Sequence, residues 1–145
     1  MGDNSSKERR DVSLVVADAL CRVALDEARR QGALVSVAVV DAGGHLVRFA
    51  RMDGAEIAGP TLATDKAFTA VAHRISTAEL TKLTEPGGEL YGLQSNGSGR
   101  YVVFGGGVPL WSNDRVVGAV GVSGGSVAQD VACAEAALAL WTDTN

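Results

Sequence analysis

The sequence predicts an α+β domain in which a roughly five-stranded antiparallel sheet carries helices. Segments with helical periodicity stand at both ends, and short β-branched runs joined by turns lie between them, an order that favours hairpins over alternating βαβ units. Apolar residues make up 46% of the chain but aromatic residues only 5%, so the core must consist mainly of valine, alanine and leucine. A length of 145 residues gives room for one hydrophobic core. We therefore expect a flexible tail at residues 1–10 and a single domain over residues 11–145.

The first helix is predicted to begin at Asp11, which can cap it, and to end at Gly32. Two strands are expected next, at residues 34–40 and 45–50, because both runs have strand-like composition and turn-forming residues separate them. These two strands predict a β-hairpin. The apolar positions of the helix recur at helical spacing: Val12, Val15, Val16, Ala19, Leu20 and Val23.

A second helix is predicted over residues 59–74, because Pro60 suits the first turn of a helix. Ser76 and Glu79 form a capping box, which predicts a short third helix. Residues 86–100 are rich in glycine, serine and asparagine and predict a long irregular loop, a kind of segment that often carries function.

Three more strands are expected, at residues 101–104, 108–112 and 115–122. Ser126 and Gln129 form a second capping box, which predicts the start of a closing helix. Apolar residues continue down that helix at helical spacing: Val127, Val131, Ala134, Leu138 and Trp141.

The composition argues against several classes of function. A net charge of −4 without a cluster of lysine and arginine argues against nucleic-acid binding. The first ten residues lack the apolar segment of a secretory signal, and no apolar run approaches the ~20 residues of a membrane span. We therefore expect a cytoplasmic location and no membrane contact. Cys21 and Cys133 lie in apolar helical segments without a CxxC pattern and are predicted to be buried free thiols.

Any chemistry that needs an imidazole must use His45 or His73, because the chain has only two histidines. His45 follows a glycine turn and is expected at an exposed hairpin position. His73 ends a helix, where it can face the negative end of the helix dipole. Neither histidine belongs to an HExxH pattern, so no metal site is predicted.

Five groups of short strings occur in one order along the chain. In these strings the chain resembles the GlcG/HbpS-type family, which includes the C-terminal domain of PduO-type proteins. The resemblance implies a profilin-like (PAS-like) α/β/α sandwich that self-associates into dimers, larger rings or octamers. It also implies mixed functions, since some relatives bind haem and others are encoded with glycolate, diol or aromatic catabolism. The strings are VAVVD and GGHL within residues 37–46, RMDGA at 51–55, KAFTA at 66–70, GGVPL at 106–110 and VGAVGVSG at 117–124.

The charged candidate residues fall in these strings. Lys66 lies in a helix of small apolar residues and could hold a carboxylate or a haem propionate, or act as a base; the alternative is an ordinary solvated lysine. Arg51 could clamp a carboxylate while Asp53 orients it or accepts a proton, the alternative being a surface ion pair. His45 is a further candidate for proton transfer.

Other candidates lie near the last two predicted strands. Gly106 and Gly107 could offer backbone N–H groups to a ligand, or could simply form a β-bulge. Ser123 matches GxSxG, but no histidine follows it, so we expect it to donate a backbone N–H to a small anion rather than to act as a nucleophile. Asp130, inside the closing helix, is expected to be a surface carboxylate that compensates the helix dipole.

Together these residues predict an oligomeric protein that binds a small carboxylate-bearing organic compound. It would act by proton transfer, as a tautomerase, isomerase or hydrolytic deaminase, and would require no cofactor. The expected catalytic residues are Lys66, Asp53 and His45, and the expected binding residues are Arg51, Gly106, Gly107 and Ser123.

Two alternatives stay open. The first is a non-catalytic haem-binding or haem-sensing protein, in which the iron ligand would be His45, His73, Met52, a tyrosine or a cysteine and the haem would be held non-covalently, since the chain has no CxxCH. The second is an accessory oligomer without a small ligand.

Overall fold

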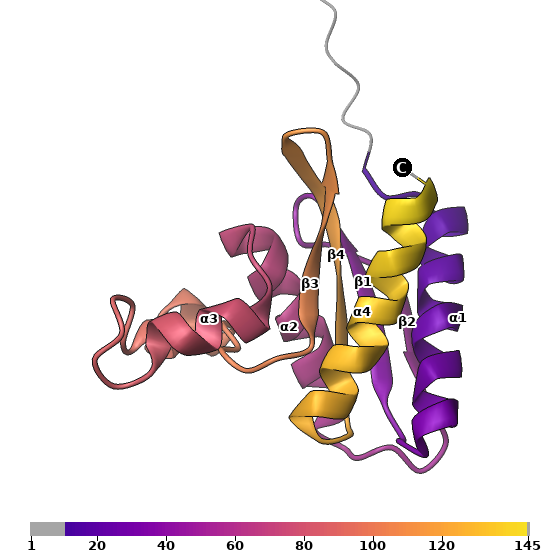
Figure 1. The fold of residues 1–145 in the computed structure, drawn as a ribbon, viewed down its shortest axis with the longest axis horizontal. Helices are drawn as coiled ribbons and strands as arrows, with labels where there is room; N and C mark the ends of the chain where they lie inside the picture. The colour runs from indigo at the N-terminus through magenta and orange to yellow at the C-terminus, as the bar shows by residue number, and fades with distance from the viewer. Residues whose placement is uncertain (1–10, 145) are drawn as a thin grey trace, which may run out of the picture.

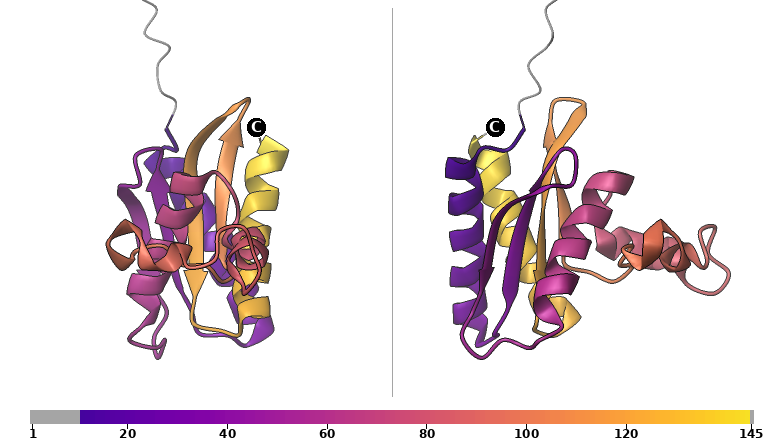
Figure 2. Two further views of the ribbon diagram at one scale, coloured as in Figure 1. Left: turned by 90° about the vertical axis from the view of Figure 1, so that its left-hand side faces the viewer. Right: turned by 180° about the vertical axis from the view of Figure 1, so that it is seen from behind.

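The computed structural model describes residues 11–144 and places a four-stranded antiparallel sheet between two layers of helices (Figure 1). Helices α1 and α4 cover one face of the sheet, and α2 covers the other (Figure 2). The α+β class and the α/β/α layering are therefore confirmed. The tail expected at residues 1–10 lies outside the described residues. The strand order is β2-β1-β4-β3. The elements are α1 (Leu14–Gln31), β1 (Ser36–Asp41), β2 (Leu46–Arg51), α2 (Gly59–His73), α3 (Thr77–Thr84), β3 (Gly107–Ser112), β4 (Arg115–Ser123) and α4 (Val127–Thr144).

Local capping residues fix most helix ends as expected. The Ser76 hydroxyl accepts the Glu79 N–H at the start of α3, and Ser126 and Gln129 bond reciprocally at the start of α4. Gly32 adopts a left-handed conformation with φ of 68° after α1. The expectation that α1 begins at Asp11 is wrong, because the Ser13 hydroxyl is the cap that accepts the Val16 N–H.

Helix α1 begins later in the chain than predicted because the backbone of Val12 is hydrogen-bonded to the sheet. Its N–H donates to the Val117 carbonyl of β4 at 3.0 Å, which holds residue 12 outside the helix. The side chain of Val12 is buried against the core. The chain therefore makes one contact with β4 before it turns into α1.

The expected fifth strand is absent from the described residues, and the prediction of five strands is wrong. Residues 101–104 do not join the sheet, because the Val102 N–H donates to the hydroxyl of Thr69 on α2 at 2.9 Å instead of to a neighbouring strand. The other four strands lie within two residues of their expected bounds. Strand β3 is consequently an edge of the sheet.

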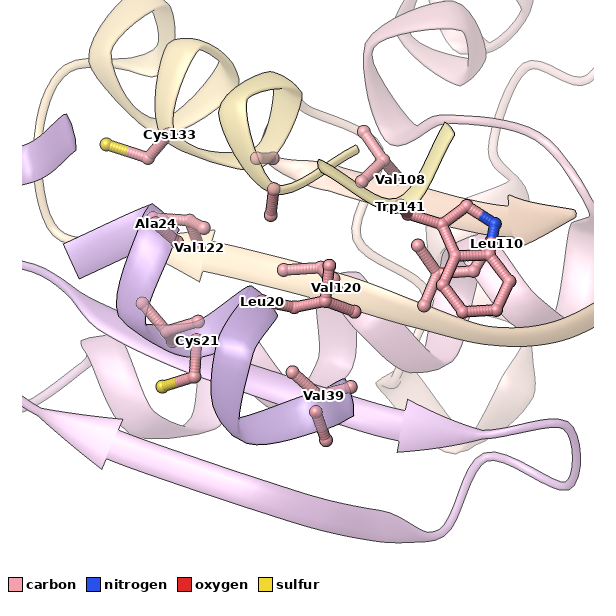
Figure 3. Close-up of a cluster of buried hydrophobic side chains, with 14 of the residues drawn as sticks. Leu20, Cys21, Ala24, Val39, Val108, Leu110, Val120, Val122, Cys133 and Trp141 are labelled. Atoms are coloured by element: carbon pink, nitrogen blue, oxygen red, sulfur yellow. The ribbon is translucent and has the colours of Figure 1, made fainter. Parts of the chain in front are cut away.

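Small aliphatic side chains fill the space between the sheet and helices α1 and α4 (Figure 3). Burial of such side chains is the main stabilising contribution of this layer. At one end of the layer, Trp141 is buried and its indole N–H donates to the carbonyl of Trp111 at 2.8 Å. Cys21 and Cys133 are free and buried here, as expected. Other members include Leu20, Ala24, Val39, Val108, Leu110, Val120 and Val122.

On the opposite face, α2 lies in direct backbone contact with the sheet. A Cβ atom at Gly121 of β4 would stand 2.0 Å from the carbonyl oxygen of Ala63, and one at Gly107 of β3 would stand 2.4 Å from that of Lys66. Only glycine fits where two backbones approach so closely. The strand glycines therefore set how near α2 can lie to the sheet.

Residues 77–106 leave the end of α2, extend away from the sheet and return to β3 (Figures 1 and 2). This arm contains α3 and two short 3₁₀ turns, Leu93–Ser95 and Gly97–Gly99. Its outgoing and returning parts are joined where the Thr81 hydroxyl donates to the Val103 carbonyl at 2.7 Å. Within residues 11–144, no helix is long and apolar enough to span a membrane.

We expect Gly121→Ala to lower the free energy of unfolding by about 3 kcal/mol, because the added methyl group must push α2 away from β4. Urea denaturation followed by circular dichroism measures this change. Gly99→Ala is the matched control, since a Cβ there meets nothing within 4 Å and only its φ of 77° carries strain, about 1 kcal/mol. Equal losses for the two variants would contradict the close contact of α2 with β4.

Both thiols should be unreactive in the folded protein. Burial raises the pKa of Cys21, and burial together with nearby carboxylates raises the pKa of Cys133 to about 11, so little thiolate forms at pH 8. Titration with Ellman's reagent at pH 8 should detect no rapid thiol in buffer and two after addition of guanidinium chloride. Rapid modification of either cysteine without denaturant would show that the core between α1 and α4 opens.

Candidate functional site

A buried ion pair joins the helices on the two sides of the sheet. Lys66, in the middle of α2, is fully buried, and its Nζ donates to the Val122 carbonyl at 2.9 Å and to Asp130 Oδ2 at 3.1 Å. Asp130 lies in the first turn of α4, and its Oδ1 accepts the Gly125 N–H at 2.9 Å. The expectation that Asp130 is a surface carboxylate is wrong, because only 3% of the residue is exposed.

Gly106, immediately before β3, lies against the Lys66 ammonium. A Cβ atom at Gly106 would stand 2.8 Å from Lys66 Nζ and 2.5 Å from the Val122 carbonyl oxygen, so a side chain at this position has no space. The ring centroid of Phe104 lies 5.0 Å from Nζ, within range of a cation–π interaction. The Gly107 N–H donates to the Thr77 hydroxyl at 2.9 Å. The lysine is thus enclosed by protein.

Burial and the ion pair shift the pKa values of Lys66 and Asp130 in opposite directions. Burial lowers the pKa of Lys66, and the Asp130 carboxylate, with a smaller contribution from Glu56, partly restores it. Burial likewise raises the pKa of Asp130, and Lys66 partly lowers it again. Each group therefore depends on the other to remain charged, and removal of one would leave the other as a buried charge without a counter-ion.

Arg51 and Asp53 lie elsewhere, where β2 ends. Both are exposed, and they line a groove of about 360 Å³ together with Leu25, Arg29 and other residues. Lys66 is not among the residues that line this groove. The structure therefore does not gather the arginine, the aspartate and the lysine around one cavity.

His45 lies in the turn at the other end of the same hairpin. Its side chain is 81% exposed, and its Nδ1 lies 3.1 Å from Asp41 Oδ1. The length of β2 separates it from Arg51, about 20 Å for six residues at 3.3 Å per residue. Ser123, at the end of β4, is buried next to the carbonyl that binds Lys66. Of the expected site residues, the structure brings together Lys66, Gly106, Gly107 and Ser123.

A second cluster lies at the end of α2, and the sequence patterns did not identify it as a unit. His73 Nδ1 is 3.1 Å from the Thr69 carbonyl, a contact in which this nitrogen donates its hydrogen. The His73 ring meets the Tyr101 ring edge to face at 4.4 Å, and Tyr101 stacks on Phe68 at 6.3 Å. All three rings are half-buried. The cluster combines aromatic surface with an imidazole nitrogen.

Residues of one helical face hold this cluster together. The Thr69 hydroxyl accepts the Val102 N–H, which fixes the returning end of the arm against α2. Arg100 donates from Nε to Asp65 Oδ1 at 3.0 Å, and its guanidinium carbon lies 3.7 Å from the centroid of the Phe68 ring. The positions of Asp65, Thr69 and His73 at intervals of four residues in α2 indicate this shared face, but their partners come from the loop.

A larger groove of about 490 Å³ runs between the edge strand β3, the start of α3 and the end of α4. Trp111, Trp141 and Leu138 form apolar walls, and Arg74 lies at its border. Histidine, cysteine, methionine and tyrosine are missing from its lining, so these walls offer none of the usual iron-binding side chains. Over residues 11–144, no group of three or more His, Cys, Asp and Glu side chains is placed to hold a metal ion.

Comparisons with known proteins cover nearly the whole chain. The family model described as "Haem degrading protein HbpS-like" matches residues 12–139. A 15.0 kDa protein in the dhaT-dhaS intergenic region of Citrobacter freundii is 39% identical over 140 residues, which are 97% of this chain and 99% of that protein. The corrinoid adenosyltransferase PduO of Salmonella typhimurium is 42% identical over 136 residues, which are 92% of this chain but only 40% of PduO.

Solved structures with the same fold include the PduOC:heme complex and HbpS. The PduOC:heme complex has a TM-score of 0.85 and 40% identity, covering 89% of this chain and 94% of that one. A double mutant of HbpS from Streptomyces reticuli has a TM-score of 0.83 and 31% identity, covering 90% of this chain and 86% of the other.

We expect Asp130→Ala to lower the free energy of unfolding by about 3 kcal/mol, because it leaves the Lys66 ammonium buried without its counter-ion. Asp26→Ala is the control, since it breaks the exposed pair with Arg29 and should cost at most about 1 kcal/mol. The double variant Lys66→Met with Asp130→Leu should recover most of the loss. The interpretation fails if Asp130→Ala costs no more than Asp26→Ala in the same urea titration.

Proposed function

The chain belongs to the HbpS-like family, and on this basis we propose that it is a haem-binding protein in which His73 is the iron ligand. The observation that carries the proposal is the hydrogen bond from His73 Nδ1 to the Thr69 carbonyl at 3.1 Å. A histidine that binds a metal through one nitrogen commonly donates its other N–H to a carbonyl or carboxylate, which fixes the ring and the tautomer.

Three of the candidate ligands differ in what their donor atoms already do. His45 is exposed at a hairpin turn, bonded to Asp41, and has no aromatic neighbour among the contacts of the described residues. Met52 is half-buried, and its sulfur accepts the Val35 N–H at 3.3 Å. His73 alone of the three combines a restrained ring with adjoining aromatic surface. His73 therefore fits the requirements of an iron ligand best.

The surroundings of His73 also fit the rest of the haem molecule. The half-buried rings of Tyr101 and Phe68 add apolar surface beside His73. Arg100 places a positive charge over Phe68, in a position to attract an acidic group. When bound, haem supplies a redox-active iron, and these residues would bind it and orient it. A similar solved structure, the PduOC:heme complex, and the description of the family as haem degrading support the choice of this ligand.

Proton-transfer catalysis on a carboxylate compound has less support. That function needs Arg51, Asp53, His45 and Lys66 around one substrate, whereas these side chains occupy separate places and Lys66 is enclosed. Self-association and a cytoplasmic location stay predictions.

Titration of the purified protein with hemin should give a saturable Soret band. His73→Ala should weaken hemin binding by at least about tenfold and shift the band, because the iron loses its protein ligand. His45→Ala is the matched control, since it removes the other histidine from an exposed turn and should leave both the affinity and the band unchanged. Circular dichroism of each variant checks that the fold is intact.

Two outcomes would count against the proposal in different ways. A linear, unsaturable hemin titration of the wild-type protein would overturn haem binding itself. A saturable titration that His73→Ala leaves unchanged would keep haem binding and overturn the assignment of the ligand.

A further inference from the structure

Arg100 is held more firmly than an ordinary surface arginine. Its Nε donates to Asp65 Oδ1 at 3.0 Å, and its guanidinium carbon lies 3.7 Å from the centroid of the Phe68 ring. Two residues further on, the Val102 N–H donates to the Thr69 hydroxyl at 2.9 Å, which ties this part of the backbone to α2. A side chain restrained in this way loses little further freedom when it binds a ligand.

The ring beneath the guanidinium is itself fixed. A Cβ atom at Gly44, in the turn between β1 and β2, would stand 2.7 Å from the Phe68 ring, so the turn backbone packs directly against it. On another side, Tyr101 stacks on Phe68 with ring planes 16° apart. The guanidinium therefore lies on a platform formed by α2, the hairpin turn and the end of the arm.

Part of the donor capacity of Arg100 is not used within the protein. A guanidinium carries five N–H donors, and among residues 11–144 the guanidinium of Arg100 donates only from Nε, to Asp65. Forty per cent of the Arg100 side chain is exposed, whereas only 16% of the Asp65 side chain is. The arginine is thus the more exposed member of the pair, and among the described residues its Nη groups make no hydrogen bond. Two such nitrogens match the two oxygens of a carboxylate.

The position of Arg100 relates it to the proposed iron ligand. Arg100 precedes Tyr101 in the chain, and the Tyr101 ring contacts His73. The Arg100 guanidinium lies over the ring of Phe68. Phe68 and His73 are five residues apart in α2, about 7.5 Å along the helix axis. A ligand that reached His73 through its centre would bring a peripheral acidic group into the neighbourhood of Arg100.

We propose that Arg100, fixed by Asp65 and Phe68, binds a carboxylate of the ligand, which for haem is a propionate. This inference rests on the proposed haem binding and adds a residue that selects for the acidic edge of the molecule. The carboxylate would accept hydrogen bonds from the Nη groups, while Nε stays bonded to Asp65.

The test measures the affinities of two ligands for three proteins. The ligands are hemin and hemin dimethyl ester, in which both carboxylates are uncharged. The proteins are the wild type, Arg100→Gln and the control Arg48→Gln. Arg48 is well matched, because 41% of its side chain is exposed and its Nε also donates to an aspartate, Asp18, but it lies on β2 and bonds to α1. Urea denaturation of each variant checks its stability.

Arg100→Gln should weaken hemin binding by roughly tenfold and leave the affinity for the ester nearly unchanged, because the lost contact exists only with a charged carboxylate. Arg48→Gln should change neither affinity. Arg100→Lys should restore part of the hemin affinity, since it keeps the charge but loses the planar fork.

Equal loss of affinity for hemin and its ester in Arg100→Gln would assign Arg100 a merely structural role and overturn the inference, as would no loss for either. In both cases saturable hemin binding by the wild type leaves the proposed function standing. Absence of saturable binding by the wild type overturns the proposed function and this inference together.

Discussion

The approach of helix α2 to strands β3 and β4 is the constraint on which the rest of the structure depends. Glycines in the strands let the backbone of α2 come within contact distance of the sheet, at Gly121 against Ala63 and at Gly107 against Lys66. Because α2 lies this close, the Lys66 side chain can reach the Val122 carbonyl and, beyond it, Asp130 on α4. The same placement presents the outer face of α2 to the returning arm, where Thr69 captures the backbone of Val102.

Features that depend on neighbouring residues were predictable from the sequence. The capping boxes at Ser76 and Ser126 and the glycine at position 32 mark helix ends through hydrogen bonds within a few residues. The four strands followed from their composition and turns. The fifth strand did not form because the N–H of Val102 is bound by a threonine 33 residues earlier, and a side-chain partner so far away leaves no local pattern.

The candidate site was less predictable for a related reason. Lys66 is a charged residue in a run of small apolar residues, which are typical of a buried helix face, and its side chain is indeed buried. Its partner Asp130 is 64 residues away, in a helical turn where a carboxylate on the surface would look the same. The cluster around His73 likewise draws Arg100 and Tyr101 from the end of a long loop, whose path depends on tertiary contacts. Family membership fixes the fold more firmly than it fixes which side chains meet a ligand.

Enclosure of the Lys66 ammonium beneath Gly106 has a consequence for how this protein can change over evolutionary time. A side chain at position 106 would collide with both the amine and the Val122 carbonyl, and a shorter residue at position 66 would strand the aspartate. Substitutions at positions 66 and 130 are therefore interdependent, and a lineage could alter them safely only as a pair. Position 106 is restricted to glycine separately, because the Val122 carbonyl would block a side chain there whatever residues stand at 66 and 130.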